Sequence, residues 1–489
     1  MKVNFSKETY PFYFIALLGL ALLTYSSVRA GMLSFTHDES LTCLWYTPKN
    51  FMQIVNYHSP TANNHILNTL LIKYITHLLP EKEIFLRLPN LLAHATYIFF
   101  SVLILKQFRN PLIIIGGFIL INFNPYMLDF FSLARGYGLA LTFMLLSIYC
   151  FFSYLRSGLK RYVYWYYIFA AFSVLSNFVY LHYFVTAIVV FNILYINELR
   201  FKKISVRGII ENNIPTLIVG ILLTIILFEP IRKLNKFDEL YGQGQKGFFN
   251  DTIISFVNGT NYGQTYGAPY IKILAIGLLL MVALICISVM AELTQKQFKI
   301  KNSTQTIFLL FLILPAISSI MQHYLLNDQF LTYRLTLLFV PLLGLSIVSF
   351  FNFLITSKYK IPTSVLLILI STSMFFHTIN AANFKYFSEW KYDANTKNMI
   401  LELEKIVPDK IKNQKVKLGI NWLFEPTINF YQQTMNLDWL EKVTREGIEG
   451  DFDYYYILQD QLNSIDQELI IQEYETSNSV LLKKKKQSI

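Results

Sequence analysis

Long apolar segments recur along this chain and dominate what it can fold into. A helix that crosses the hydrocarbon core of a bilayer needs roughly 20 apolar residues, and a window of that length finds about eleven candidates. Hydrophobic residues fill 54% of the 489 positions and charged residues 15%, which is too apolar for a soluble protein. The sequence therefore predicts an all-α polytopic membrane body, with spans centred near Leu20, Ile98, Phe118, Leu145, Phe172, Val189, Leu222, Leu280, Ile313, Leu345 and Leu369.

The short connections between these spans predict an orientation. With a cytoplasmic N-terminus, every inside loop is basic, as the positive-inside rule expects. We therefore expect a plasma (inner) membrane protein in which an odd number of spans places everything after about Ile379 outside. The net charge of +11 then reflects topology and anionic lipid, and no nucleic acid partner is expected. The predicted inside residues are Lys2, Lys7, Lys106, Arg109, Arg156, Lys160, Arg161, Arg200, Lys202, Lys203, Arg207, Lys296, Lys299, Lys301, Lys358 and Lys360.

The composition changes sharply after residue 379 and divides the chain into two parts. Residues 1–379 form the predicted membrane body, and residues 380–489 form a small extracytoplasmic α/β domain of ordinary domain size. Within the second part, apolar residues at helical spacing from Met399 to Ile406 predict an amphipathic helix. Short strands are expected over 416–420, 453–458 and 479–482, with a helix beginning at Pro426 or Thr427.

Two adjacent carboxylates, Asp38 and Glu39, follow the first span directly and open a polar loop over residues 31–87. Ionisable groups held near membrane depth are costly and usually functional. A carboxylate placed there can act as a general base toward a hydroxyl group. The plainer interpretation of the pair is a solvated acidic turn that caps a helix.

Four further polar patches fall on the same predicted side of the membrane. They read Asn64-His65-Ile66-Leu67, Arg87-Leu88-Pro89-Asn90, Ala134-Arg135-Gly136-Tyr137 and Tyr333-Arg334. In this order, with the acidic pair first, they resemble the motifs of GT-C glycosyltransferases that use polyprenyl-phosphate sugars. The likeness is to the glycosyltransferase family 39 group, which includes bacterial aminoarabinose and galacturonic acid transferases and mannosyltransferases. Two departures from that pattern are Ile66, where a double proline stands in the group, and the order Tyr333-Arg334, which is reversed.

The resemblance implies a GT-C fold and an inverting, single-displacement transfer of a sugar from a polyprenyl-phosphate donor. Asp38 would be the general base, and Glu39 would bind the acceptor or orient Asp38. Arginine suits a departing phosphate because its planar guanidinium donates two hydrogen bonds at once. The residues that would bind the donor phosphate or sugar are Arg135, Tyr137, Arg334, His65 and Arg87. Plainer roles remain open, namely interfacial anchors for the arginines and for Tyr137, and an organising role for Arg87 at the start of the second span.

No phosphate-binding loop or dinucleotide fingerprint occurs in the sequence, so a nucleotide sugar is not expected as direct donor. No cofactor is predicted with certainty. A divalent metal ion held by His58, His65 and Asp38 is possible, but the spacing does not establish it. A glycine-rich segment within residues 229–270 suits either a mobile flap or a plain connector. The acceptor, an envelope glycan, a lipid or a protein, stays open, as do a transporter or lipid flippase and a non-catalytic scaffold as alternative functions.

Overall fold

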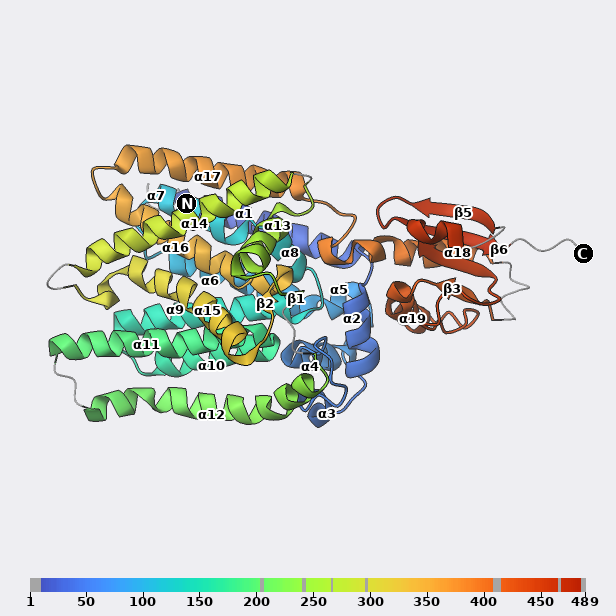
Figure 1. The fold of residues 1–489 in the computed structure, drawn as a ribbon, viewed down its shortest axis with the longest axis horizontal. Coiled ribbons are helices and arrows are strands. Elements are labelled where there is room, and N and C mark those ends of the chain that lie inside the picture. The colour runs from blue at the N-terminus through green and yellow to red at the C-terminus, as the bar shows by residue number, and fades with distance from the viewer. Residues whose placement is uncertain are drawn as a thin grey trace, which may run out of the picture.

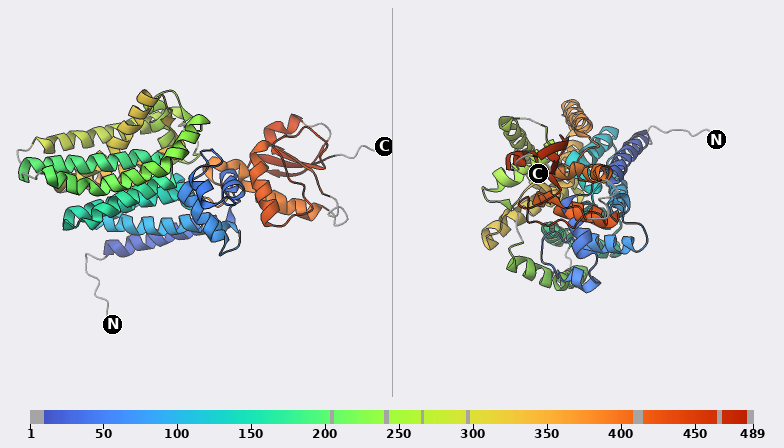
Figure 2. Two further views of the ribbon diagram at one scale, coloured as in Figure 1. Left: turned by 90° about the horizontal axis from the view of Figure 1, so that it is seen from below. Right: turned by 90° about the vertical axis from the view of Figure 1, so that its right-hand side faces the viewer.

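The computed structural model describes residues 10–202, 206–239, 243–264, 267–294, 298–407, 415–464 and 468–484. Long helices run side by side through most of the molecule, and a small domain containing a sheet extends from one end of this bundle (Figures 1 and 2). The C-terminal residues lie in that domain, at the end of the molecule farthest from the bundle.

Nine helices among the described residues are long and apolar enough to cross a membrane. A tenth candidate is a pair of helices, α7 (Pro111–Asn122) and α8 (Pro125–Phe131), bent by 65° where they meet. Asn124 precedes Pro125 and is extended, as the steric demand of a proline ring requires. The nine are α1 (Tyr10–Met32), α6 (Leu88–Leu105), α9 (Gly136–Ser157), α11 (Leu181–Lys202), α12 (Val206–Lys236), α14 (Ala268–Leu293), α15 (Thr304–Leu326), α16 (Phe339–Ile355, with the preceding turn) and α17 (Lys360–Ala381).

The predicted span centred near Phe172 corresponds to α10 (Arg161–Ser176), which is a 16-residue helix. It falls short of the length that the other candidate spans reach. Its first turns are rich in tyrosine, with Arg161 at the start, which lowers its hydropathy below that of its neighbours. Nine or ten candidate spans among the described residues agree with the expected count of about eleven to within one or two, and every predicted centre lies in a helix.

The loop over residues 31–87 is not irregular but folds into short helices. These are α2 (His37–Leu41), η1 (Thr42–Tyr46), α3 (Phe51–Val55), α4 (Ile66–Thr76) and α5 (Glu83–Leu86). Thr36 and Glu39 form a capping box at the start of α2, which satisfies backbone groups that the first turn leaves without partners. The shorter elements elsewhere in the body are η2 (Phe178–Tyr180), β1 (Gln243–Gly244), η3 (Phe249–Ile253), α13 (Ile254–Asn261), η4 (Ile300–Asn302), β2 (Phe330–Leu331) and η5 (Tyr333–Thr336).

The two ends of the bundle differ in their charged and polar residues. The connections between α6 and α7, α9 and α10, and α16 and α17 lie at the end away from the sheet domain, and all three carry the predicted basic residues (Figure 1). The four polar patches and the acidic pair lie at the other end. The expectation that these patches share one side is thus confirmed. Of the predicted inside residues, Lys2, Lys7, Lys203 and Lys296 lie outside the described residues.

The C-terminal domain is a four-stranded sheet flanked by helices. Its strand order is β3-β4-β6-β5, with β3 parallel to β4 and the other neighbours antiparallel. Three of the strands and both helices were expected from the sequence, whereas β5 was missed. The elements are η6 (Ser388–Asn395), α18 (Thr396–Ile406), β3 (Leu418–Ile420), η7 (Trp422–Phe424), α19 (Glu425–Thr434), β4 (Tyr454–Leu458), η8 (Gln459–Ser464), β5 (Glu468–Tyr474) and β6 (Ser479–Lys484).

This domain shares a hydrophobic core with the first loop of the membrane body. Phe35 stacks on Phe430 of α19 with ring centroids 4.3 Å apart, and Leu86 belongs to the same buried cluster as Met399. The backbone N–H of Phe35 donates to the hydroxyl of Tyr431 at 2.7 Å. Burial of these apolar faces fixes α2 against the C-terminal domain.

Candidate active site

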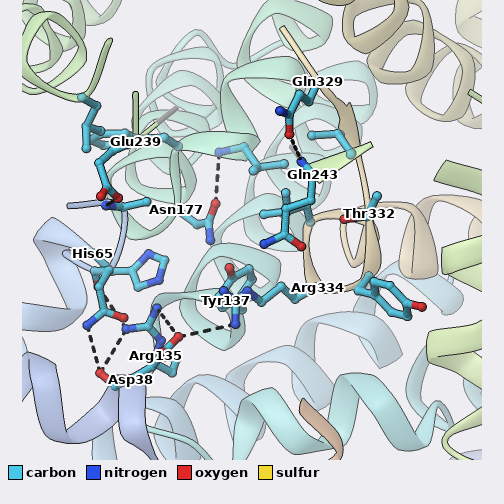
Figure 3. Close-up of a pocket in the computed structure, with 18 of the residues that line it drawn as sticks. Asp38, His65, Arg135, Tyr137, Asn177, Glu239, Gln243, Gln329, Thr332 and Arg334 are labelled. Atoms are coloured by element: carbon cyan, nitrogen blue, oxygen red, sulfur yellow. Dashed lines mark hydrogen bonds and ion pairs between the residues drawn. The ribbon is translucent and has the colours of Figure 1, made fainter. Parts of the chain in front are cut away.

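A cavity of about 1970 Å³ lies at the end of the bundle that faces the C-terminal domain. Its wall combines the start of α2, the segment before α4, the start of α9, the turn before α16, and η6 (Figure 3). Four of the seven predicted site residues meet around Asp38 in this wall: His65, Arg135, Tyr137 and Arg334. Segments that are hundreds of residues apart in sequence therefore build one site.

Asp38 projects from the first turn of α2 into the cavity. Its Oδ2 atom lies 3.4 Å from Arg135 Nη2 and 3.4 Å from Arg334 Nη1, and its side chain is 17% exposed. Burial alone would raise the pKa of this carboxyl, but Arg135 and Arg334 outweigh it and hold the pKa below its usual value. Trp390 also lowers the pKa of this carboxyl, by a smaller amount than the arginines. Asp38 is therefore ionised at neutral pH and able to accept a proton.

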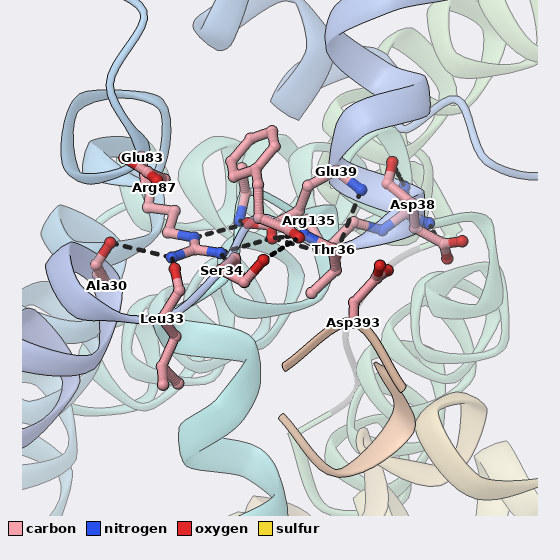
Figure 4. Close-up of polar contacts among 12 residues, drawn as sticks. Ala30, Leu33, Ser34, Thr36, Asp38, Glu39, Glu83, Arg87, Arg135 and Asp393 are labelled. Atoms are coloured by element: carbon pink, nitrogen blue, oxygen red, sulfur yellow. Dashed lines mark hydrogen bonds and ion pairs between the residues drawn. The ribbon is translucent and has the colours of Figure 1, made fainter. Parts of the chain in front are cut away.

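Glu39, the adjacent carboxylate, does not face the cavity (Figure 4). It accepts two hydrogen bonds from Arg87, at 2.8 Å from Nε and 2.7 Å from Nη2, and both side chains are fully buried. Glu39 also accepts from the backbone N–H of Ala134 at 2.6 Å, directly before Arg135. Of the roles left open for Glu39 and Arg87, this geometry favours positioning. Asp38 directly precedes Glu39 and Arg135 directly follows Ala134, so the buried pair orients both residues.

The two arginines are held in place by different parts of the chain. Arg135 is buried, and its Nη1 donates to the Asn63 carbonyl at 3.0 Å and to Thr42 Oγ1 at 3.3 Å. Arg334 belongs to η5 and pairs with Glu389 at 3.1 Å, with its guanidinium over the Trp390 ring at 5.4 Å. Neither cation is as tightly bound to Asp38 as Arg87 is to Glu39, so both can turn toward an incoming anion.

His65 and Tyr137 pack edge to face, with ring centroids 5.2 Å apart. The His65 Nε2 atom is buried and has no hydrogen-bond partner among the described residues. Burial, followed by the charges of Arg135 and Arg334, lowers the pKa of His65 well below its usual value, so the ring is neutral. Gly136 allows this packing, because a Cβ atom there would lie 1.9 Å from the Ser176 carbonyl oxygen and 2.8 Å from His65 Cβ.

Three site residues that the sequence analysis missed come from η6, at the start of the C-terminal domain. Glu389 and Trp390 contact Arg334 as described, and Glu389 also accepts a hydrogen bond from Tyr126. Asp393 accepts from the backbone N–H of His37 at 2.7 Å and thereby holds the residue before Asp38. The one sequence feature that could indicate these residues is an acidic and aromatic run directly after the last span, but such a run equally marks the beginning of a soluble domain.

A buried ion pair anchors the segment that leads into η6. Arg29 of α1 and Asp129 of α8 lie 2.5 Å apart, and both are buried. Asp129 Oδ2 accepts from the backbone N–H of Ser388 at 2.8 Å, and Arg29 Nη2 donates to the Tyr386 carbonyl at 2.7 Å. Because the next residue is Glu389, this pair fixes where η6 enters the cavity wall.

The glycine-rich segment within residues 229–270 forms another part of the cavity wall. Gln243 and Gly244 pair with β2 just before Thr332, and the backbone N–H of Gln243 donates a hydrogen bond to Gln329 Oε1 at 2.6 Å. This pairing links the segment to the turn that carries Arg334. Tyr241 and Gly242, which belong to the predicted flap, lie outside the described residues.

The described part of the chain contains no group of three or more His, Cys, Asp or Glu residues arranged to hold a metal ion. His58, one of the residues considered for a cation, is exposed and is not part of the cavity wall. The cavity wall instead carries cationic groups that can bind an anion.

The class of protein that the fold and site define is an integral membrane protein with a charged cavity at one end of its helical bundle. No family model and no curated protein matches the sequence. Among the solved structures similar to it are two of ArnT from Cupriavidus metallidurans, which match over nearly the whole length of both chains. The one bound to undecaprenyl phosphate has 10% identity and a TM-score of 0.49, with 97% of this chain and 98% of that chain covered. The apo structure has 9% identity, a TM-score of 0.36 and 98% coverage of both chains. At these values the likeness assigns no activity.

Proposed function

We propose that this protein is a GT-C-type glycosyltransferase that moves a sugar from a polyprenyl-phosphate donor to an acceptor hydroxyl group. The observation that carries the proposal is the Asp38 carboxylate in the cavity, flanked by Arg135 and Arg334 at 3.4 Å each. One group can accept a proton while the two others bind a phosphate, which are the roles that such a transfer requires.

In the proposed reaction the acceptor oxygen attacks the anomeric carbon from the face opposite the phosphate. The new glycosidic bond forms as the bond from carbon to phosphate oxygen breaks, so the configuration inverts and no covalent enzyme intermediate is needed. Asp38 takes the hydroxyl proton, and the electron pair of the broken bond leaves on the polyprenyl phosphate. Positive charge on Arg135 and Arg334 stabilises that leaving group.

The two arginines also explain how donor binding would activate Asp38. In the protein without a donor, both guanidinium groups face the carboxylate and lower its pKa, which makes it a weak base. A bound phosphate competes for the same cations and returns basicity to Asp38. The base would then be strongest when the donor is in place.

An apolar part of the cavity wall supports a lipid-linked donor. It consists of side chains of α11 and α15 that are partly exposed, among them Leu181, Val185, Met321 and Leu325. A prenyl chain lying against these helices would bring its phosphate to the arginines from the bilayer. With the basic loops in the cytoplasm, as the positive-inside rule expects, this end of the bundle is extracytoplasmic.

The test is an Asp38→Asn variant, compared with Asp438→Asn, which changes an exposed carboxylate on the C-terminal domain. Loss of a general base costs roughly 10²- to 10⁴-fold in rate. We expect that loss for Asp38→Asn at normal protein abundance, and unchanged envelope glycans for the control, as measured by mass spectrometry. Unchanged glycans in the Asp38→Asn strain would contradict the proposal. A transporter or flippase would form no glycosidic bond when the purified protein is given a lipid-linked sugar and an acceptor.

A further inference from the structure

The cavity has a second polar region where the C-terminal domain meets the first loop. Trp45 from η1, Trp422 from η7 and Arg445 from the segment after α19 all line the cavity, and we call them the aromatic rim. Trp45 is 43% exposed and Trp422 50% exposed, and the Arg445 side chain is 44% exposed. Two indole rings and a cation are thus offered to whatever occupies this part of the cavity.

The position of Arg445 is set by both parts of the chain. Its guanidinium carbon lies 5.9 Å from the Trp45 ring centroid and 5.8 Å from the Trp422 ring centroid. Its Nε donates to Glu425 at 3.2 Å. Asn429 holds the backbone of Val443 through two hydrogen bonds of 3.1 Å, which anchors the segment that carries Arg445.

The aromatic rim lies next to Asp38. His37 Nδ1 donates to the Leu423 carbonyl at 2.7 Å, the direction that a carbonyl acceptor requires. The His37 ring also packs edge to face against Trp422, with centroids 6.0 Å apart. Because His37 directly precedes Asp38, these contacts place Trp422 close to the proposed base.

The chemistry of the rim differs from that of the donor side. The faces of indole rings pack well against the C–H face of a saccharide, and binding cavities combine such rings with a few placed polar groups. A guanidinium pairs with phosphate or carboxylate. The C-terminal domain supplies two of the three rim residues, whereas the apolar wall comes from α11 and α15 of the bundle.

We propose that Trp45, Trp422 and Arg445 bind the acceptor, a saccharide that carries a phosphate or carboxylate group. The inference rests on the proposed function, because an acceptor site has meaning only for a transferase. It assigns the C-terminal domain a direct part in acceptor choice. A purely structural role, in which Arg445 only ties the two domains together, makes the opposite prediction for saccharide binding.

Binding is measured by calorimetry on the full-length protein in detergent micelles. The probes are a bisphosphorylated glucosamine disaccharide, trigalacturonate, neutral maltotriose and inorganic phosphate. The first two separate a phosphate from a carboxylate as the anionic group. The variants are Trp422→Ala, Trp422→Phe and Arg445→Gln. The matched controls are Trp165→Ala, an exposed indole on α10 outside the cavity wall, and Lys405→Gln, an exposed cation on α18.

At least one anionic saccharide should bind, and Trp422→Ala and Arg445→Gln should each weaken it by roughly tenfold, the effect of losing a well-placed contact of about 1.4 kcal/mol. Trp422→Phe should retain most of the affinity, because a ring remains, and both controls should match the unmodified protein. The proposal would be overturned if Trp422→Ala bound the anionic saccharide as tightly as the unmodified protein does, or if maltotriose bound as tightly as the anionic saccharides. Binding of inorganic phosphate alone, or no binding of any saccharide, would also overturn it.

The same measurements on Asp38→Asn separate this inference from the proposed function. Saccharide binding that depends on the rim and is unchanged in Asp38→Asn supports a saccharide site at the rim; if no transfer is found as well, the proposed function fails while that binding site stands. If transfer requires Asp38 but the acceptor KM is the same in Trp422→Ala and Trp422→Phe, the rim is not the acceptor site while the proposed function stands.

Discussion

Replacing Arg87 with methionine tests whether the buried pair with Glu39 holds the site together. Arg87 donates two hydrogen bonds to Glu39 and three more to the carbonyls of Ala30, Leu33 and Ser34, at 2.9 to 3.0 Å. Methionine fills much of the volume but provides none of these donors. A bare carboxylate would remain in the interior beside carbonyl groups at the end of α1 that have lost their partner.

The expected cost follows from that geometry. Removing one partner of a buried ion pair destabilises a protein by about 3–5 kcal/mol, a large part of a typical total of about 5–15 kcal/mol. A double variant, Arg87→Met with Glu39→Gln, leaves neither charge unpaired. Because the pair is coupled, its cost should fall short of the sum of the single costs by about 2 kcal/mol or more.

The measurement is the free energy of unfolding in mixed micelles, titrated with a denaturing detergent and followed by tryptophan fluorescence. Arg232→Met is the matched control, because Arg232 makes the same two-bond contact with Glu229, at 2.8 Å twice, but is 60% exposed. An exposed pair of this kind contributes about 0–1 kcal/mol. Similar costs for Arg87→Met and Arg232→Met, or additive costs in the double variant, would refute the reasoning.

Three further predictions follow from the site. Arg334→Gln removes a cation that lowers the pKa of Asp38, so the pKa of this base should rise. The acid limb of the normalised profile of rate against pH should therefore shift to higher pH. Burial raises the pKa of Asp393 to about 8 from 3.8, so its contribution to stability is full below pH 4 and is lost as pH rises through 8; Asp393→Asn should flatten the melting temperature over that range. Gly136→Ala should cost about 1–3 kcal/mol by overpacking against the Ser176 carbonyl oxygen and His65. Gly220→Ala, where no atom lies within 4 Å of the added carbon, should not destabilise the protein in the same melting experiment.

Much of the fold was predictable because its signals are local. Long runs of apolar residues predict the membrane helices, and basic residues in the short loops predict which connections lie together at one end of the bundle. The exceptions have local causes as well: α10 is shortened by its polar first turns, and Pro125 bends the pair α7 and α8. The strand β5 was missed because its exposed edge position leaves little hydrophobic patterning to detect.

The site was predictable in part. Asp38, Arg135, Arg334, His65 and Tyr137 were named from sequence, and the structure brings them together around one cavity. Glu389 and Trp390 were not named, because nothing local indicates that a segment after the last span returns to the cavity wall. The contact of Glu389 with Arg334 joins positions 55 residues apart, with the two membrane helices α16 and α17 between them.

The sequence by itself determined that two carboxylates stand where the first span ends, and that basic and acidic residues lie at opposite ends of the helices. Only the tertiary structure decided which carboxylate serves the cavity. Consecutive residues on a helix point about 100° apart, so α2 can present either Asp38 or Glu39 but not both. Arg87, which lies 48 residues after Glu39, settles the rotation by burying Glu39 against the end of α1, which leaves Asp38 facing the two arginines.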